Sequence, residues 1–276
     1  MEPIVARKMW RTLEPYHGLI YFAPEGQQRY EALGVTGFSG YFASRAAPMG
    51  AVAPAVIEAT FYNFAPSVVR AAIPAAWDAA TPTQLTAARL EAADAALRRI
   101  VGDAVDGAEM VRAAELAEVA ARAIDTDGRP IAAALAALDW PDRPHIALWH
   151  AIAILREYRG DGHVACLVTH RIDGLESLVL HSAMGEIPRD ALLMTRGWSL
   201  DEWDAAVERL SLRGLVDAEG AFTDEGRAVR DGIEQETDEL SLTPWMTLGQ
   251  DDCNELRALV RPWSRAVVEG GTFGFG

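Results

Sequence analysis

Four polar side chains stand singly inside apolar or aromatic stretches of the chain: His17, Arg45, Asn63 and His163. A mostly apolar pocket that orients its ligand with a few polar groups would produce this pattern. An arginine among aromatic rings suits an anionic or planar ligand, and a histidine can take or give a proton near neutral pH. The pattern therefore predicts a site for a small, partly apolar molecule.

Residues 156–163 extend this predicted site, since they include two arginines, two glycines, an aspartate and a histidine. Gly160 is expected to end one helix, and Asp161 to cap the next. His163 then falls in a first turn, and the N-terminus of a helix together with Arg156 and Arg159 can hold an anion. The residues predicted to bind the ligand are His17, Tyr21, Tyr41, Arg45, Asn63, Arg156, Arg159 and His163.

A structural role is the alternative for several of these residues. A buried His17 can be satisfied by one backbone carbonyl group, and Asn63 can serve in a turn or as a cap. Asp161 and Arg159 can form a helix cap and a surface ion pair. The sequence leaves both roles open.

An enzyme of small-molecule metabolism, with His17 or His163 as acid or base, is a further hypothesis. No nucleophile motif, phosphate-binding loop or dinucleotide fingerprint accompanies these histidines, so the cofactor is left undetermined. His145 and His150 are five residues apart and His163 and His170 seven apart, whereas two zinc ligands on one helix face are typically four apart. We expect no metal site.

The net charge argues against attraction to nucleic acid or to anionic lipid. The 276 residues include 25 Lys and Arg against 40 Asp and Glu, which gives a net charge of −15. Both kinds of partner need a basic surface. No stretch has the apolar length of a membrane span, and the first residues lack the pattern of a secretory signal. We expect a cytoplasmic protein whose partner is a small molecule, not nucleic acid or a membrane.

Residues 199–240 have the clearest predicted architecture. Ser199 is a good N-cap for a helix over 200–212, and Glu202 at the third helical position completes a capping box. Two very short strands, 215–216 and 221–222, then precede a long exit helix. This order of helix, two-stranded wing and helix is typical of a winged helix.

The predicted fold is therefore mainly α, with a helical N-terminal domain and a C-terminal winged helix that has a short two-stranded wing. Residues 1–172 form the helical domain with the pocket, and residues 173–242 form the winged helix. Residues 243–276 form a C-terminal helix and a tail that pack back on the N-terminal part.

Two resemblances to known families support this division. The segments RGLV (213–216) and FTDEGR (222–227) resemble the MarR-type winged-helix family, over about residues 175–240. That resemblance implies a dimeric, ligand-responsive DNA-binding regulator. Most of the chain also resembles a family of actinobacterial SalK-like proteins, through PYHGLIYFAPE (15–25), GYFASRAAPMG (40–50) and REYRGDGHVA (156–165). This second resemblance implies an architecture and no established activity.

The charge of the C-terminal segment differs from that of a DNA-binding module. Residues 186–239 contain fifteen acidic residues and six arginines, and the predicted wing over 217–220 is short and acidic. Phosphate contacts dominate the affinity of proteins for DNA, so such a surface repels the duplex. We expect a small-molecule-binding protein whose winged helix has lost DNA binding. A MarR-like ligand-responsive regulator, which would be a homodimer, is the alternative.

Overall fold

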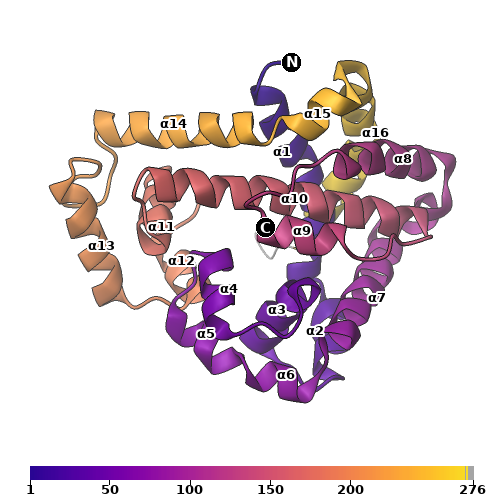
Figure 1. The fold of residues 1–276 in the computed structure, drawn as a ribbon, viewed down its shortest axis with the longest axis horizontal. Helices are drawn as coiled ribbons and strands as arrows, with labels where there is room; N and C mark the ends of the chain where they lie inside the picture. Colours follow the sequence, from indigo (N-terminus) through magenta and orange to yellow (C-terminus); the bar gives the residue numbers. More distant parts are fainter. Residues whose placement is uncertain (271, 273–276) are drawn as a thin grey trace.

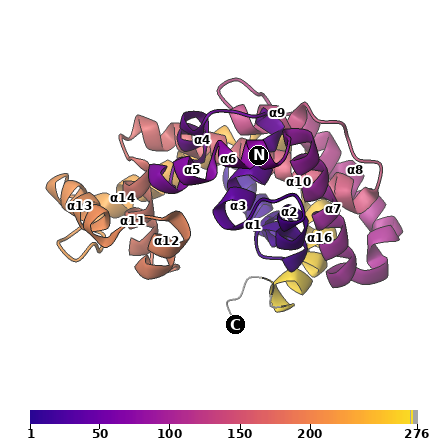
Figure 2. The same cartoon turned by 90° about the horizontal axis from the view of Figure 1, so that it is seen from below.

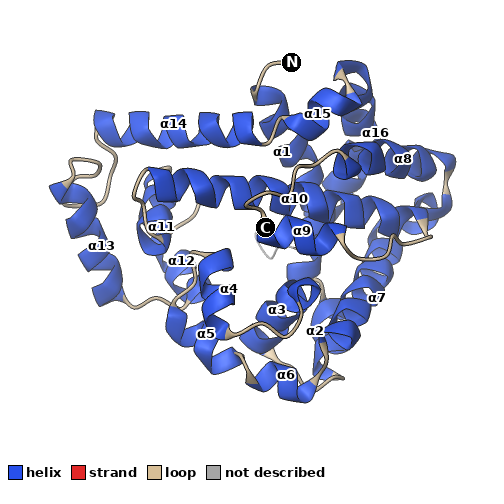
Figure 3. Ribbon diagram, viewed as in Figure 1, coloured by secondary structure: helices blue, strands red, loops and turns tan. Residues whose placement is uncertain are grey.

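Every named element of the structure is helical (Figure 3). The computed structural model describes residues 1–270 and 272. None of the helices in this range has the length and apolar character needed to cross a membrane. The elements, in chain order, are α1 (Ile4–Gly18), η1 (Leu19–Tyr21), α2 (Pro24–Glu31), α3 (Gly37–Ala46), η2 (Ala47–Met49), α4 (Pro54–Phe61), α5 (Pro66–Ala72), α6 (Ala75–Ala79), α7 (Pro82–Val101), η3 (Gly102–Asp106), α8 (Ala108–Arg122), α9 (Pro130–Ala136), α10 (Pro144–Thr169), α11 (Gly174–Ala183), α12 (Arg189–Arg196), α13 (Leu200–Leu212), α14 (Asp224–Leu240), α15 (Thr243–Leu248) and α16 (Gln250–Glu269).

The prediction of a mainly α protein is confirmed, but the predicted winged helix with a two-stranded wing is wrong. Between α13 and α14 there is one isolated β-bridge, from Val216 to Phe222, and no strand is assigned among the described residues. The carboxylate of Asp217 accepts two backbone N–H groups and closes the turn after this single pair. Thr223 is already the N-cap of α14. The connecting segment is therefore too short to form a ladder.

The central helix of the molecule is α10, which is 26 residues long. Residues 145–155 are buried on all sides of the helix. They pack against α1, α7, α8 and α9, and the helix also contacts α14, which lies above it in Figure 1. A helix that is apolar on every face belongs in the interior of a protein, and α10 follows this rule.

The break predicted in the Gly-Asp-Gly sequence of α10 is also wrong, because the helix continues through it. Asp161 caps another helix instead: its Oδ2 accepts the N–H groups of Ile131 at 3.1 Å and Ala132 at 3.0 Å, in the first turn of α9. At Gly162 a Cβ atom would lie 2.6 Å from Nη1 of Arg129. This glycine permits a close approach of another side chain and does not end the helix.

Two hydrophobic clusters fill the interior. The larger cluster joins the N-terminal helices to α15 and α16, and Trp149 and Tyr16 are among its largest buried side chains. The smaller cluster includes residues of α11, α12 and α13, among them Trp203 and Leu210. Because α10 contributes Trp149 to the first cluster and Leu167 to the second, it links the two parts. Figure 2 shows α11 to α14 extending to one side of the remaining helices.

Helices α12 and α13, with the three residues between them, form a compact two-helix unit, called the α12–α13 segment below. The turn begins at Gly197, whose φ of 77° is a left-handed value that glycine adopts without a Cβ clash. Ser199 and Glu202 then exchange hydrogen bonds at the start of α13, which confirms the predicted capping box. The predicted helix over 200–212 is confirmed as well.

The C-terminal helix α16 packs on α1. The Ser264 hydroxyl donates to the carbonyl oxygen of Thr12 at 2.7 Å, and Arg257 Nε donates to the Thr12 hydroxyl at 3.2 Å. The predicted packing of the glycine-rich tail concerns residues 271 and 273–276, which lie outside the described residues. The predicted domain boundaries stay a prediction.

Candidate functional site

A cavity of about 290 Å³ lies where the two hydrophobic clusters meet. Its lining includes Phe64 from the larger cluster and Leu192 from the smaller one. Side chains from α3, the end of α4, α10, α11, α12 and α14 form the walls. We call it the junction cavity. Its volume is close to that of the smaller pockets that hold small molecules in proteins.

The junction cavity brings together several residues that the sequence places far apart. Tyr41 and Arg45 come from α3, Asn63 follows α4, and Arg156 and His163 come from α10. Arg45 Nη1 donates to the hydroxyl oxygen of Tyr41 at 3.1 Å, so these two side chains are held in place by each other. All five residues were predicted to bind the ligand, and they share one cavity. That they bind a ligand stays a prediction.

The other predicted residues, His17, Tyr21 and Arg159, do not line the junction cavity. His17 is 1 % exposed, and its ring stacks on Trp149 with 4.9 Å between the ring centroids. Tyr21 lines a different cavity. Arg159 is buried in an ion pair with Asp238 at 2.7 Å, so its charge is already compensated.

Three of the four arginines that line the junction cavity have a carboxylate partner. Arg45 forms two hydrogen bonds with Glu157, at 2.9 and 3.2 Å, and Arg156 forms a third at 2.8 Å. Burial acts to raise the pKa of Glu157, but the two guanidinium groups outweigh burial and lower this pKa to about 2. Arg230 pairs with Glu234 at 2.8 Å. These three arginines therefore need no anionic ligand.

Arg196, the last residue of α12, is the exception. Its Nη1 donates to the carbonyl oxygen of Thr195 at 3.3 Å, and its guanidinium group lies 4.8 Å from the centroid of the Phe64 ring. Within the described residues its buried Nε has no hydrogen-bond partner, and no carboxylate pairs with it. Burial lowers the pKa of Arg196, and the positive charges of Arg45 and Arg156 contribute to the decrease. An anion in the cavity would supply the missing partner.

Two uncharged histidines also line the junction cavity. Burial lowers the pKa of His163 to about 4, and it lowers the pKa of His181 as well. The Thr237 hydroxyl donates to the carbonyl oxygen of Ile233 at 2.7 Å, so it accepts a hydrogen bond from Nδ1 of His163 at 2.9 Å. The tautomer with the proton on Nδ1 fits this network, and in that tautomer Nε2 is an acceptor.

Asp161 lines the same cavity while it caps α9. Burial raises the pKa of its carboxyl group to about 6, and the negative charge of Glu157 contributes to the increase. The two N–H donors from α9 act in the opposite direction but do not cancel burial. The cavity therefore holds one carboxyl group that titrates close to neutral pH.

Among the charged and titratable residues of this cavity that sequence reasoning missed are Glu157, His181 and Arg196. A signal for Glu157 was present, because it is the single acidic residue among residues 144–159 and comes directly after Arg156. His181 and Arg196 lie near the ends of short helices, where polar residues are ordinary. Only the fold, which brings α10, α11 and α12 together around one cavity, places these two side chains beside the predicted ones.

The exposed face of α13 is acidic. Arg209 pairs with Asp173 at 2.8 Å and with Glu176 at 3.1 Å. Arg213 donates to two backbone carbonyl oxygens that follow α10, at 2.8 and 3.0 Å. The exposed carboxylates of α13 are Asp201, Glu202, Asp204 and Glu208. Both arginines are thus engaged within the protein, while the carboxylates face the solvent.

Comparison with known proteins identifies a family for nearly the whole chain. A family model described as a helix-turn-helix family matches residues 6–274, which is nearly the whole chain. No curated protein and no solved structure matches. In the structure, α12, the turn at Gly197 and α13 follow one another as two helices joined by a short turn. The chain belongs to the helix-turn-helix family.

Proposed function

We propose that this protein binds a small, partly apolar molecule with an anionic group in the junction cavity. The observation that carries the proposal is Arg196, a cation on the cavity wall that pairs with no carboxylate of the described residues. Removing a charge from water without a partner costs free energy. A carboxylate or phosphate of the ligand would offset this cost with a charge-assisted hydrogen bond.

The remaining walls explain why the ligand is expected to be partly apolar. Phe61, Phe64 and Leu178 supply aromatic and aliphatic surface. The Arg45 guanidinium group covers one face of the Phe61 ring, 4.2 Å from its centroid, so this part of the wall is fixed. Nε2 of His163 is an acceptor for a hydroxyl or amide group of the ligand.

We also propose that the α12–α13 segment has lost DNA binding. A recognition helix needs cations that reach phosphates and base edges. Arg209 of α13 and Arg213 directly after it are engaged with Asp173, Glu176 and backbone carbonyl groups, and the exposed side chains of this helix include four carboxylates. Such a face is better adapted to contacts within the protein or with another protein.

Native mass spectrometry of the full chain tests ligand binding. The purified protein is incubated with a small-molecule extract of cells and freed of unbound molecules by gel filtration. We expect a mass increment that disappears on denaturation and is strongly reduced in Arg196→Met. Arg189→Met is the matched control, because Arg189 is an exposed residue of the same helix that pairs with Asp190. A wild-type protein without an increment, or an equal increment in Arg196→Met, would refute the proposal.

A ligand-responsive transcriptional regulator is the second candidate. It is favoured by two hydrogen bonds that tie the α12–α13 segment to the cavity wall: Trp198 Nε1 to the carbonyl oxygen of Asn63 at 3.0 Å, and Ala65 N to that of Arg196 at 2.9 Å. A ligand could therefore change the position of α13.

A mobility-shift assay at low salt with the promoter of its own operon distinguishes a DNA-binding regulator from a protein that has lost DNA binding. A shift at micromolar protein favours the regulator, which we expect to be a homodimer, and no shift favours the loss of DNA binding. Closer kinship with SalK-like proteins stays a prediction.

A further inference from the structure

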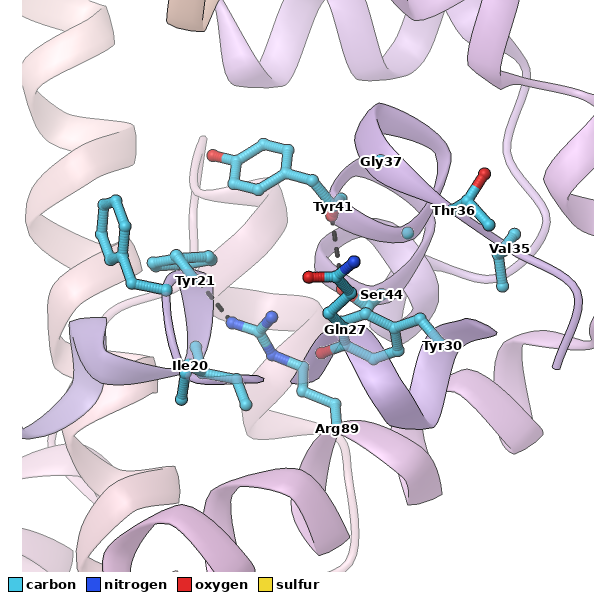
Figure 4. A pocket seen from close by; sticks show the side chains of 13 residues that line it. Ile20, Tyr21, Gln27, Tyr30, Val35, Thr36, Gly37, Tyr41, Ser44 and Arg89 are labelled. Atoms are coloured by element: carbon cyan, nitrogen blue, oxygen red, sulfur yellow. Dashed lines mark hydrogen bonds between the residues drawn. The ribbon is translucent and has the colours of Figure 1, made fainter. Parts of the chain in front are cut away.

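A second cavity, also of about 290 Å³, lies within the N-terminal helices. Its walls come from η1, α2, α3 and α7, and Figure 4 shows the side chains that line it. Tyr41 lines both this cavity and the junction cavity, while α10 to α14 contribute no residue to the lining of the second one. It is therefore a separate site of the helical half. We call it the Arg89 cavity.

Arg89 enters this cavity from α7 with little exposure to solvent, 7 %. Its Nη2 donates to the Tyr21 hydroxyl at 3.1 Å, which is the one hydrogen bond of its guanidinium group to a described residue. The group also lies 5.1 Å from the centroid of the Tyr21 ring and 5.3 Å from that of Trp149. No carboxylate within the described part of the chain pairs with it. A phenol and two ring faces stabilise a cation, but they do not neutralise it.

A second polar group in the Arg89 cavity also lacks a partner. The hydroxyl oxygen of Tyr30 is buried, and no described residue forms a hydrogen bond with it. Arg89 and Tyr30 line the same cavity and enter it from different helices, α7 and α2. Figure 4 shows both side chains reaching into the space between Tyr21 and Gln27. A guanidinium group and a hydroxyl group are together the donors that a carboxylate needs.

The other walls of the Arg89 cavity are mostly aromatic and aliphatic. The rings of Tyr21 and Tyr41 lie 5.4 Å apart at their centroids, and Ile20 and Val35 add aliphatic surface. The Ser44 hydroxyl is already engaged with the carbonyl oxygen of Tyr41 at 3.3 Å. The cavity thus has a cationic group beside aromatic and aliphatic side chains, which is an arrangement that a flat acid would fill.

We infer that the Arg89 cavity binds a small planar aromatic carboxylate. The carboxylate lies on the Arg89 guanidinium group and the Tyr30 hydroxyl, and the aromatic ring lies against Tyr21 and Tyr41. This site shares Tyr41 with the junction cavity but does not involve Arg196, α12 or α13.

Isothermal titration calorimetry with the full chain tests the inference, with benzoate as the probe. Benzamide has the same shape without the charge, and inorganic phosphate has the charge without the ring. We expect saturable binding of one benzoate, with benzamide and phosphate at least about tenfold weaker, the size of effect that a charge-assisted hydrogen bond supplies. No saturable benzoate binding, or equal binding of benzamide or phosphate, would overturn the inference.

Variants locate the site. Arg89→Met is expected to weaken benzoate binding at least about tenfold, while Arg112→Met leaves it unchanged, since Arg112 forms an exposed ion pair with Glu255 on α16. Tyr30→Phe removes one oxygen atom and keeps the ring, so it tests the site even if Arg89→Met does not fold. We expect about threefold weaker binding, as for loss of one hydrogen bond.

A crystal structure of the complex should place the benzoate carboxylate on Arg89. Benzoate in another place, or variants at both positions that bind like the wild type, would contradict the assignment.

Discussion

The indole nitrogen of Trp198 donates a hydrogen bond to the main-chain oxygen of Asn63 at 3.0 Å. Asn63 lines the junction cavity, and Trp198 lies in the turn between α12 and α13. A second bond, from Ala65 N to the carbonyl oxygen of Arg196 at 2.9 Å, joins the same two parts of the chain. The position of the α12–α13 segment therefore depends on the wall of the cavity, so that changes at the turn should affect stability more than changes in a free loop.

Gly197→Ala tests how closely the turn between α12 and α13 packs against Val68. The residue has a φ of 77°, which costs about 1–2 kcal/mol for a residue with a Cβ atom, and the added Cβ would also collide with the side chain of Val68. We expect a loss of about 2–3 kcal/mol in the free energy of unfolding, measured by urea denaturation. Gly185→Ala is the control, since Gly185 has a similar φ of 79° and nothing lies near the added Cβ. Equal losses in the two variants would mean that the turn does not press against Val68.

Arg196→Met should make the ligand-free protein slightly more stable. The substitution keeps an apolar side chain over Phe64 and removes a partly buried charge that has no carboxylate partner among the described residues. Replacement of poorly compensated buried charges by apolar residues is often stabilising, and we expect a gain of about 1 kcal/mol. Thermal and urea unfolding of the wild type, Arg196→Met and Arg189→Met measure it. A clear loss of stability in Arg196→Met would show that Arg196 stabilises the fold and is not kept for a ligand.

Glu157→Gln should be strongly destabilising, because it leaves Arg45 and Arg156 close together without their shared carboxylate. Loss of one partner of a buried ion pair costs about 3–5 kcal/mol. The pKa of Glu157 in the folded protein, about 2, is below its ordinary value, so its contribution is present at neutral pH. The contribution should disappear as the pH falls from about 5 to about 2. Glu118→Gln, at an exposed pair with Arg122, should leave the urea midpoint unchanged, and a similar result for Glu157→Gln would contradict this account.

Asp161 should contribute a pH dependence of stability opposite in direction to that of Glu157, and Asp161→Asn should remove this contribution. The folded protein binds the Asp161 proton more tightly than the unfolded chain, because burial raises this pKa to about 6. The wild type therefore has the full contribution of this group below about pH 4 and loses it as the pH rises through about 6. Asparagine keeps an acceptor for the N–H groups of α9 and does not titrate.

Urea denaturation at several pH values checks this prediction. We expect the wild type to lose about 1–2 kcal/mol relative to Asp161→Asn between about pH 4 and pH 7. Parallel stability curves for the two proteins would show that Asp161 has the same pKa in the folded and unfolded states.

The sequence predicts the elements that depend on local chemistry. The capping box of Ser199 and Glu202 determines the start of α13, and both residues lie within one helical turn. The break in α10 was predicted wrongly because the role of Gly162 depends on a distant contact, and the wing was predicted wrongly because its turn closes locally after a single pair of residues. Gly162 permits the approach of Arg129 from another part of the chain, and Asp217 closes its turn before a second pair of residues can form.

The residues of the candidate site also divide into those that the local sequence indicates and those that only the folded protein brings together. Single polar residues in apolar segments indicated Arg45, Asn63 and His163, and these three line one cavity. His17 shows the same pattern in the sequence, but it packs on Trp149 outside that cavity. Arg196 could not be selected, because the absence of a carboxylate partner among the described residues is a property of the folded protein and not of the residues around it in the sequence.

The central claim, that the junction cavity holds an anionic small molecule, is tested most directly by a crystal structure of the protein with the molecule that it retains. We predict density for this molecule between α3, α10 and α12, with its anionic group within hydrogen-bond distance of Arg196 and a polar group near Nε2 of His163. Density for the molecule at any other place, with only water beside Arg196, would contradict the account.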